Sequence, residues 1–127
     1  MIKQMTSKDK DMVAGWWREL GLDPKNLDYP LFSSFIAFKN QVPLYAVSLQ
    51  LVVGSKVAYI DGFIRNPNTK TDITVVDNLH DHISKFAKSM GYERFHTITS
   101  YPEVVKRDTE LGYKFYSEPF YFGVREI

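Results

Sequence analysis

The chain has 127 residues, with 16 lysines and arginines against 15 aspartates and glutamates and a formal net charge of +1. This length is enough for one domain with a single core, and the balanced charge gives no reason to expect nucleic acid or an acidic membrane as a partner. Cysteine is absent, which excludes disulfides, thiolate metal ligands and cysteine nucleophiles. No segment reaches the roughly 20 apolar residues of a membrane span, and the first residues lack an apolar run of signal-peptide length. We therefore expect a cytoplasmic protein.

The spacing of apolar residues and turn signals predicts an order of short strands and three helices. In chain order these are a strand over 2–5, a helix over 8–20, a loop over 22–31 with at most a short helix, strands over 33–39, 43–53 and 56–65, a helix from 71 or 72 to 90, a strand over 94–99, a helix over 103–111, and strands over 113–117 and 120–126. Thr6 and Asp9 have the form of a capping box, and Gly21 ends the first helix. Turns at 40–41 and 54–55 join three strands into an antiparallel meander.

The stretch from Val57 to Tyr92 organises the rest of the predicted fold. Its strand has two largely apolar faces, as a central strand does: Val57, Tyr59, Asp61 and Phe63 form one, and Ala58, Ile60, Gly62 and Ile64 form the other. Gly62 within the strand indicates a β-bulge or a close approach of another part of the backbone. The helix that follows has Thr71 or Asp72 as its N-cap and ends at Gly91. It presents one apolar face, made of Val75, Leu79, Ile83, Phe86 and Met90.

This order of elements resembles the GNAT acetyltransferase superfamily over nearly the whole chain. Two local features add to the resemblance: the strand, turn and long helix of 57–92, and the segment Glu110-Leu111-Gly112-Tyr113-Lys114, which is similar to the usual ending of the family's last helix. The resemblance implies a single α+β domain over 1–127. Its mixed, mostly antiparallel twisted sheet would have about six or seven strands and be flanked by helices.

The resemblance also implies a site for acetyl-CoA, in a V-shaped gap between splayed central strands. Its pantetheine would pair along the fourth strand, at Phe63, Ile64 and Arg65. Its pyrophosphate would lie on the turn before the long helix, at Lys70, Thr71, Asp72 and Ile73. A helix start is a natural anion site, because unpaired N–H groups and the helix dipole point at the ligand.

The turn departs from the family's pattern, which is an Arg or Gln followed by two glycines as R/Q-x-x-G-x-G/A. Lys70 stands at the arginine position, but Ile73 and Val75 stand at the glycine positions. A β-branched side chain neither reaches positive φ at low cost nor leaves room for a phosphate. Asp72 adds a negative charge, and its more ordinary role is to cap the helix.

Three positions are candidates for catalysis. The family often has an asparagine and a tyrosine near its last helix. Counted back from Gly112, these positions fall on or beside Tyr101 and on Asp108, so neither residue type matches. A general base must lie within hydrogen-bond reach of the attacking amine. Asp61 on the central strand is the best placed base, and Glu103 is a second choice. The alternative for Asp61 is a structural role, as a surface-edge or hydrogen-bonded group.

Other chemistries have little support in the sequence. His80 and His82 are two residues apart on a helix and project to different faces, so we expect no metal site. A nucleophile elbow, a P-loop and a dinucleotide fingerprint are all absent from the sequence. Basic residues near aromatics on the long helix are explained by its solvent-facing side.

Two hypotheses follow. In the first, the chain is a GNAT-like N-acetyltransferase that uses acetyl-CoA and a small-molecule or protein amine as acceptor. In the second, it is a catalytically inactive GNAT-like binding or structural module with a protein partner, similar to small divergent versions encoded by phages. In either case we expect a monomer or a homodimer.

Overall fold

The structure is a computed structural model that describes residues 1–26, 28–97 and 102–114. It divides into two units, Met1–Thr97 and Ile98–Ile127, which are described separately. The first unit contains β1 (Ile2–Gln4), α1 (Ser7–Glu19), the 3-10 helices η1 (Pro24–Asn26) and η2 (Leu31–Ser33), β2 (Ser34–Lys39), β3 (Val42–Leu51), β4 (Val57–Arg65), α2 (Ile73–Ser89) and β5 (Arg94–His96), and the second contains α3 (Pro102–Glu110).

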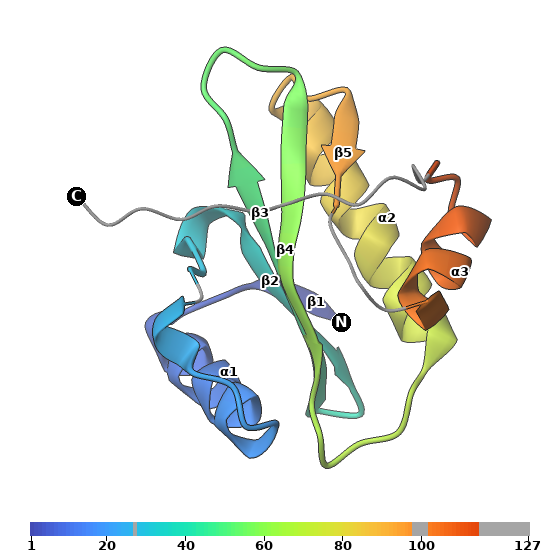
Figure 1. Ribbon diagram of the computed structural model, residues 1–127. Helices are drawn as coiled ribbons and strands as arrows, with labels where there is room; N and C mark the ends of the chain where they lie inside the picture. The colour runs from blue at the N-terminus through green and yellow to red at the C-terminus, as the bar shows by residue number, and fades with distance from the viewer. Residues whose placement is uncertain (27, 98–101, 115–127) are drawn as a thin grey trace. The chain divides into compact units, whose positions relative to one another are not determined.

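One five-stranded sheet, in the order β1-β2-β3-β4-β5, forms the centre of the first unit. The first four strands pair antiparallel, and β5 returns through α2 to pair parallel with β4. In Figure 1, α1 lies on one side of the sheet and α2 on the other. This is the predicted α+β class, with a mostly antiparallel sheet. Of the additional predicted strands, 120–126 and residues 115–117 of the strand over 113–117 fall outside the described residues, and residues 113–114 are not in a strand.

Local capping and turn signals behave as predicted. Thr6 accepts a hydrogen bond from the Asp9 N–H, and the Asp9 side chain accepts one from the Thr6 N–H, which completes the capping box of α1. Asn40 and Gln41 both have positive φ, of 51° and 67°. Two such residues make a tight hairpin turn whose twist matches the strands on either side.

Two apolar cores lie on opposite faces of the sheet. The α2-side core contains Phe35, Ala37, Leu44, Tyr45, Val47, Leu49, Val76, Leu79, Ile83 and Ala87. The α1-side core contains Met5, Val13, Trp16, Tyr29, Ile36, Ala46 and Ile64. Strands with an apolar residue on both faces are expected at the centre of such a three-layer arrangement.

The buried face of α2 is rotated slightly from the predicted one. Leu79 and Ile83 are buried as predicted, but the other buried positions are Val76 and Ala87. Val75 and Phe86 lie at the border of the core. Met90 is 46% exposed, because it is the C-cap residue after the last helical turn.

β4 contains a one-residue bulge at Gly62, as predicted. Ala46 of β3 pairs with Ile64, and Ser48 pairs with Asp61, so three steps along β4 match two along β3. Gly62 has a φ of +60°, a conformation that glycine adopts at little cost.

The bulge makes the predicted faces of β4 wrong beyond Gly62. Ile64 enters the α1-side core instead of sharing a face with Ile60, which packs against the α2-side core. Phe63 instead stacks on Tyr45, a residue of the α2-side core. One inserted residue exchanges the two faces of a strand, and simple alternation does not include it.

No helix in the described part of the chain is both long enough and apolar enough to cross a membrane.

α3 ends as predicted at a glycine, since Gly112 has a φ of +96°.

Substituting Gly62→Ala is expected to lower the free energy of unfolding by roughly 1–3 kcal/mol, measured by urea denaturation. The added Cβ would lie 2.8 Å from the Tyr29 ring, at a φ that favours glycine. Gly15→Ala is the matched control within α1, where the added Cβ meets nothing within 4 Å. It is expected to stabilise the protein by about 0.5–1 kcal/mol. Equal effects of the two substitutions would contradict the bulge geometry.

Candidate functional site

The candidate site begins where β4 runs on beyond β5. β5 pairs with β4 only over Val57–Tyr59. From Ile60 to Arg65, β4 has β3 on one side, and the described residues place no strand on the other. A strand edge of this kind offers backbone N–H and C=O groups to an extended ligand.

The side chains along this edge differ in exposure. Phe63 is 44% exposed, and its ring stacks on Tyr45 with ring centres 5.6 Å apart. Ile64 is buried in the α1-side core, so only its backbone is available to a ligand. Arg65 is half-buried, with its Nη1 3.4 Å from the Asn66 carbonyl oxygen.

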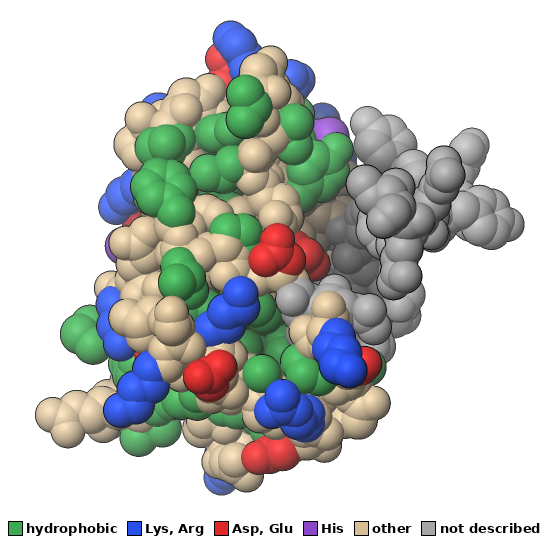
Figure 2. All heavy atoms as spheres, turned by 90° about the vertical axis from the view of Figure 1, so that its left-hand side faces the viewer, with side chains coloured by type: hydrophobic (Ala, Val, Ile, Leu, Met, Phe, Trp, Pro, Cys, Tyr) green, Lys and Arg blue, Asp and Glu red, His purple; other side chains and the backbone are tan. Residues whose placement is uncertain are grey.

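Asp61 lies at the start of this edge and is exposed. One of its carboxylate oxygens accepts the Gly62 N–H at 2.8 Å. No ion pair of Asp61 is found among the described residues, so the carboxylate is available to a cationic or proton-donating group. Seen from the side that carries α1, the surface shows both acidic and basic side chains among hydrophobic ones (Figure 2).

Asn66 shapes the turn between β4 and α2. It is buried, and its Nδ2 donates to the Pro43 carbonyl at 2.9 Å. Its Oδ1 accepts the Asn68 N–H at 3.1 Å, and its carbonyl accepts the Thr69 N–H at 3.0 Å. An asparagine that bonds the backbone two residues on can set a turn without glycine. The sequence Asn66-Pro67-Asn68 is a signal for this turn that the sequence analysis did not use.

Asp72 closes the start of α2. It is the N-cap residue, and its carboxylate accepts the Val75 N–H at 3.2 Å and pairs with Lys39 Nζ at 2.7 Å. The hydrogen bond from Lys39 lowers the pKa of this carboxyl, the Val75 N–H lowers it further, and the small desolvation acts in the opposite direction. Tyr45 Oη accepts the Asp72 N–H at 2.8 Å. One of the N–H donors expected to meet a pyrophosphate, that of Asp72, is thus engaged within the chain.

The remaining predicted groups of the turn are more accessible. Lys70 and Thr71 are exposed, and the described chain gives Lys70 no ion pair. Within the described residues, the N–H groups of Lys70, Thr71 and Ile73 have no intramolecular acceptor. Ile73 is 63% exposed, so its side chain stands where a glycine would leave room. The strand edge therefore has the backbone donors and acceptors that an extended arm such as pantetheine requires, whereas the turn lacks the glycines expected around a pyrophosphate.

The three predicted catalytic positions do not all belong to one described unit. Asp61 belongs to the first unit and Asp108 to α3 of the second. Burial and then the charge of Asp108 raise the pKa of Tyr113, and the Tyr113 N–H donates to the Asp108 carbonyl at 3.0 Å. Tyr101 lies outside the described residues, as does the side chain of Glu103.

Three contributors were not predicted from the sequence. Lys39 and Tyr45 reach the start of α2 from β2 and β3, and Tyr29 reaches Gly62 from the loop after α1. Only Tyr45 and Tyr29 carry a general signal, because a buried tyrosine hydroxyl needs a partner.

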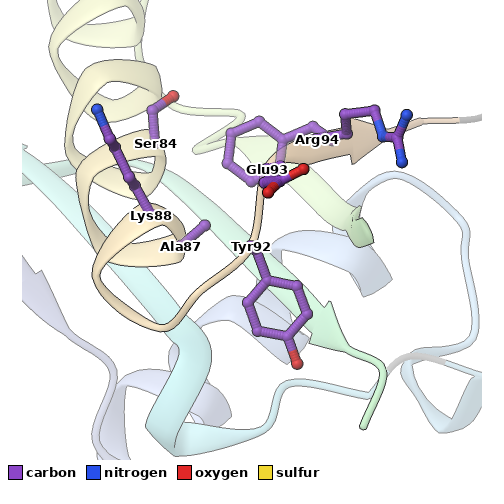
Figure 3. Close-up of a pocket in the computed structure, with 7 residues that line it drawn as sticks. Ser84, Ala87, Lys88, Tyr92, Glu93 and Arg94 are labelled. Carbon is purple, nitrogen blue, oxygen red and sulfur yellow. The ribbon is translucent and has the colours of Figure 1, made fainter. Parts of the chain in front are cut away.

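A cavity of about 420 Å³ lies elsewhere, at the C-terminal end of α2 (Figure 3). Its lining residues are Ser84, Ala87, Lys88, Tyr92, Glu93, Arg94 and Phe95. α2 has 17 residues and is about 25 Å long, so this cavity is remote from the turn at its N-terminus. In the described part of the chain, no group of three His, Asp or Glu side chains is arranged to hold a metal ion.

Comparison with known proteins finds neither a matching family model nor a matching curated protein. Solved structures do match. An aminoglycoside N-acetyltransferase, AAC(6')-Iy, in complex with a bisubstrate analogue of CoA is 17% identical and has a TM-score of 0.67, with 98% of this chain and 97% of that chain covered. An aminoglycoside acetyltransferase from an uncultured soil metagenomic sample, HMB0005, is 10% identical with a TM-score of 0.72, and 98% of each chain is covered.

N-acetylglutamate synthase from Neisseria gonorrhoeae, complexed with coenzyme A and N-acetyl-glutamate, is 15% identical with a TM-score of 0.67. The match covers 86% of this chain, which spans only 27% of the length of that synthase. At these identities the likeness is one of fold. The chain has the GNAT fold, as the order of its elements predicted.

The lowered pKa of Asp72 predicts a stability that depends on pH. Its contribution is present above the ordinary carboxyl value of 3.8 and is lost as the pH falls through the lower folded value. Asp72→Asn keeps a good N-cap but removes the charge. The gap in urea midpoint between wild type and this variant should therefore be larger at pH 7 than at pH 2.5. Asp81→Asn, on the exposed side of the same helix, is the control. A gap that does not change with pH would contradict the Lys39–Asp72 pair.

Proposed function

We propose that the chain is an N-acetyltransferase that moves an acetyl group from acetyl-CoA to an amine. The observation that supports this proposal best is the edge of β4 from Ile60 to Arg65, which we call the free edge because the described residues place no strand on it. It begins beside the exposed carboxylate of Asp61. Two of the structural neighbours described above were solved with CoA or a CoA-containing analogue. The acceptors named for those neighbours include aminoglycosides, and we propose a small-molecule or protein amine for this chain.

Each part of the edge has a role in this proposal. Phe63, Ile64 and Arg65 bind the pantetheine arm through their backbone groups, in the manner of an added strand. Lys70 and the N–H groups of Thr71 and Ile73 bind the phosphates. Acetyl-CoA would supply the acetyl group as a reactive thioester. The amine nitrogen would bond to the acetyl carbon as the C–S bond breaks, and the CoA thiolate would leave and take up a proton from solvent. Asp61 takes a proton from the attacking amine, directly or through a water.

The second hypothesis, an inactive GNAT-like module that binds a protein partner, also has a specific observation in its favour. Asp72 and Lys39 satisfy each other at the helix start, and Ile73 covers part of it. Tyr101 and Asp108 do not match the residue types of the family's catalytic positions. The two hypotheses differ in whether acetyl-CoA binds at all.

Titration calorimetry with acetyl-CoA tests the first hypothesis. We expect measurable binding by the wild type and about 3- to 10-fold tighter binding by Asp72→Asn, because a negative charge near the phosphates is removed and Lys39 is released. Asp81→Asn changes the same charge on the exposed side of α2 and is expected to alter binding less than twofold. Absence of binding at millimolar acetyl-CoA in both the wild type and Asp72→Asn would favour the inactive module.

Release of free thiol from acetyl-CoA tests the role of Asp61, with sisomicin and L-glutamate as acceptors. Asp61→Asn should reduce the rate about 100-fold, at the lower end of what a general base contributes. Binding of acetyl-CoA should change little. Asp11→Asn, an exposed aspartate on α1, is the control. An Asp61→Asn variant with the wild-type rate would remove Asp61 from the mechanism.

A further inference from the structure

Tyr29 is a buried tyrosine in the loop between η1 and η2. Its side chain is 3% exposed and belongs to the α1-side core, together with Trp16, Ile36 and Ile64. Packing alone could explain such a ring. Its hydroxyl group, however, accepts one hydrogen bond and donates another.

The hydroxyl of Tyr29 connects α1 to the bulge of β4. Trp17 Nε1 donates to Tyr29 Oη at 2.8 Å, and Tyr29 Oη donates to the Gly62 carbonyl in a short hydrogen bond. A phenol has one proton, so this arrangement uses it for Gly62 and leaves a lone pair for Trp17. Burial raises the pKa of Tyr29, the charge of Asp61 raises it further, and the Trp17 bond opposes both. The hydroxyl therefore stays protonated at neutral pH and keeps donating to Gly62.

The ring of Tyr29 also requires a glycine at the bulge. A Cβ on residue 62 would lie 2.8 Å from both Cζ and Oη of Tyr29. Two features therefore favour glycine at position 62: its φ of +60°, and the Tyr29 ring that occupies the space a Cβ would need.

The bulge decides what the free edge presents. Ile60 packs against the α2-side core, so the next residue, Asp61, points to the α1 side, where Tyr29 lies. After the bulge, Phe63 points to the α2 side and stacks on Tyr45. Gly62 is the inserted residue, so rotation of its peptide would move the side chains on either side of it, Asp61 and Phe63. The hydrogen bond from Tyr29 to the Gly62 carbonyl opposes that rotation.

We propose that Tyr29 is a positioning residue for the acetyl transfer: its hydroxyl, anchored by Trp17, fixes the Gly62 peptide and so holds Asp61 and the free edge of β4 in their working arrangement. This inference rests on the proposed function. Tyr29 is buried, so it acts through the Gly62 peptide. We expect its loss to lower the rate by displacing Asp61 and to weaken acetyl-CoA binding modestly by loosening the backbone of 63–65.

The test compares Tyr29→Phe with Tyr92→Phe. Both remove a tyrosine hydroxyl that donates to a backbone carbonyl, in the second case that of Val52 at 3.1 Å. In Tyr29→Phe we expect amide hydrogen exchange over 62–65 to be at least tenfold faster, with 57–60 unchanged, and the Trp17 indole N–H resonance to move. We expect kcat to fall about tenfold, and KM for acetyl-CoA to rise about threefold because the edge that pairs with the pantetheine is loosened. Tyr92→Phe should leave kcat and the exchange over 62–65 at wild-type values.

Two results would overturn the positioning role: unchanged exchange over 62–65 in Tyr29→Phe, or faster exchange with a wild-type kcat. If Tyr29→Phe does not fold, Trp17→Phe takes its place, since it removes the anchor and keeps the Tyr29 hydroxyl. Its exchange over 62–65 should then rise about threefold, and an unchanged rate would count against the proposal. A wild type that neither binds nor turns over acetyl-CoA is a different outcome. It refutes the proposed function, and the positioning role in acetyl transfer with it, whatever the exchange data show.

Discussion

The candidate site depends on one inserted residue in β4. Pairing with β3 continues on both sides of Gly62, so the insertion cannot be taken up by a shift of the whole strand. The two faces of β4 must instead exchange at this point. The exchange places Ile64 in one core and Phe63 on the other, with Asp61 just before the bulge. Packing of both cores therefore fixes the same backbone that the proposed site uses.

The start of α2 is subject to a second constraint, in which stability and ligand binding compete for the same groups. Asp72 caps the helix and pairs with Lys39, which favours the folded chain. An external phosphate would need the same donors and would be repelled by the same carboxylate. The capping residue that suits the isolated helix is thus unsuited to a phosphate site.

Local signals predicted much of the fold. The capping box of Thr6 and Asp9, the bulge at Gly62 and the N-cap at Asp72 each depend on a few neighbouring residues, and the structure contains all three. The faces of β4 beyond Gly62 were wrong, because the effect of a bulge on alternation depends on the register with β3. The Tyr29–Gly62 and Lys39–Asp72 contacts each join residues 33 positions apart, and nothing local in the sequence predicts such pairs.

The two halves of a CoA site depend on the sequence in different ways. Pairing along a strand edge uses backbone groups, so almost any side chains at Phe63 to Arg65 are compatible with it. A phosphate cradle instead requires that side chains be absent, and Ile73 alone is enough to obstruct it. Lys70 is exposed, and an exposed charge is screened by salt and contributes little energy. This explains why the order of elements resembles the GNAT family more closely than the turn does. It also follows that acetyl-CoA binding by this chain would rely mainly on the free edge of β4, where the Gly62 bulge sets the geometry.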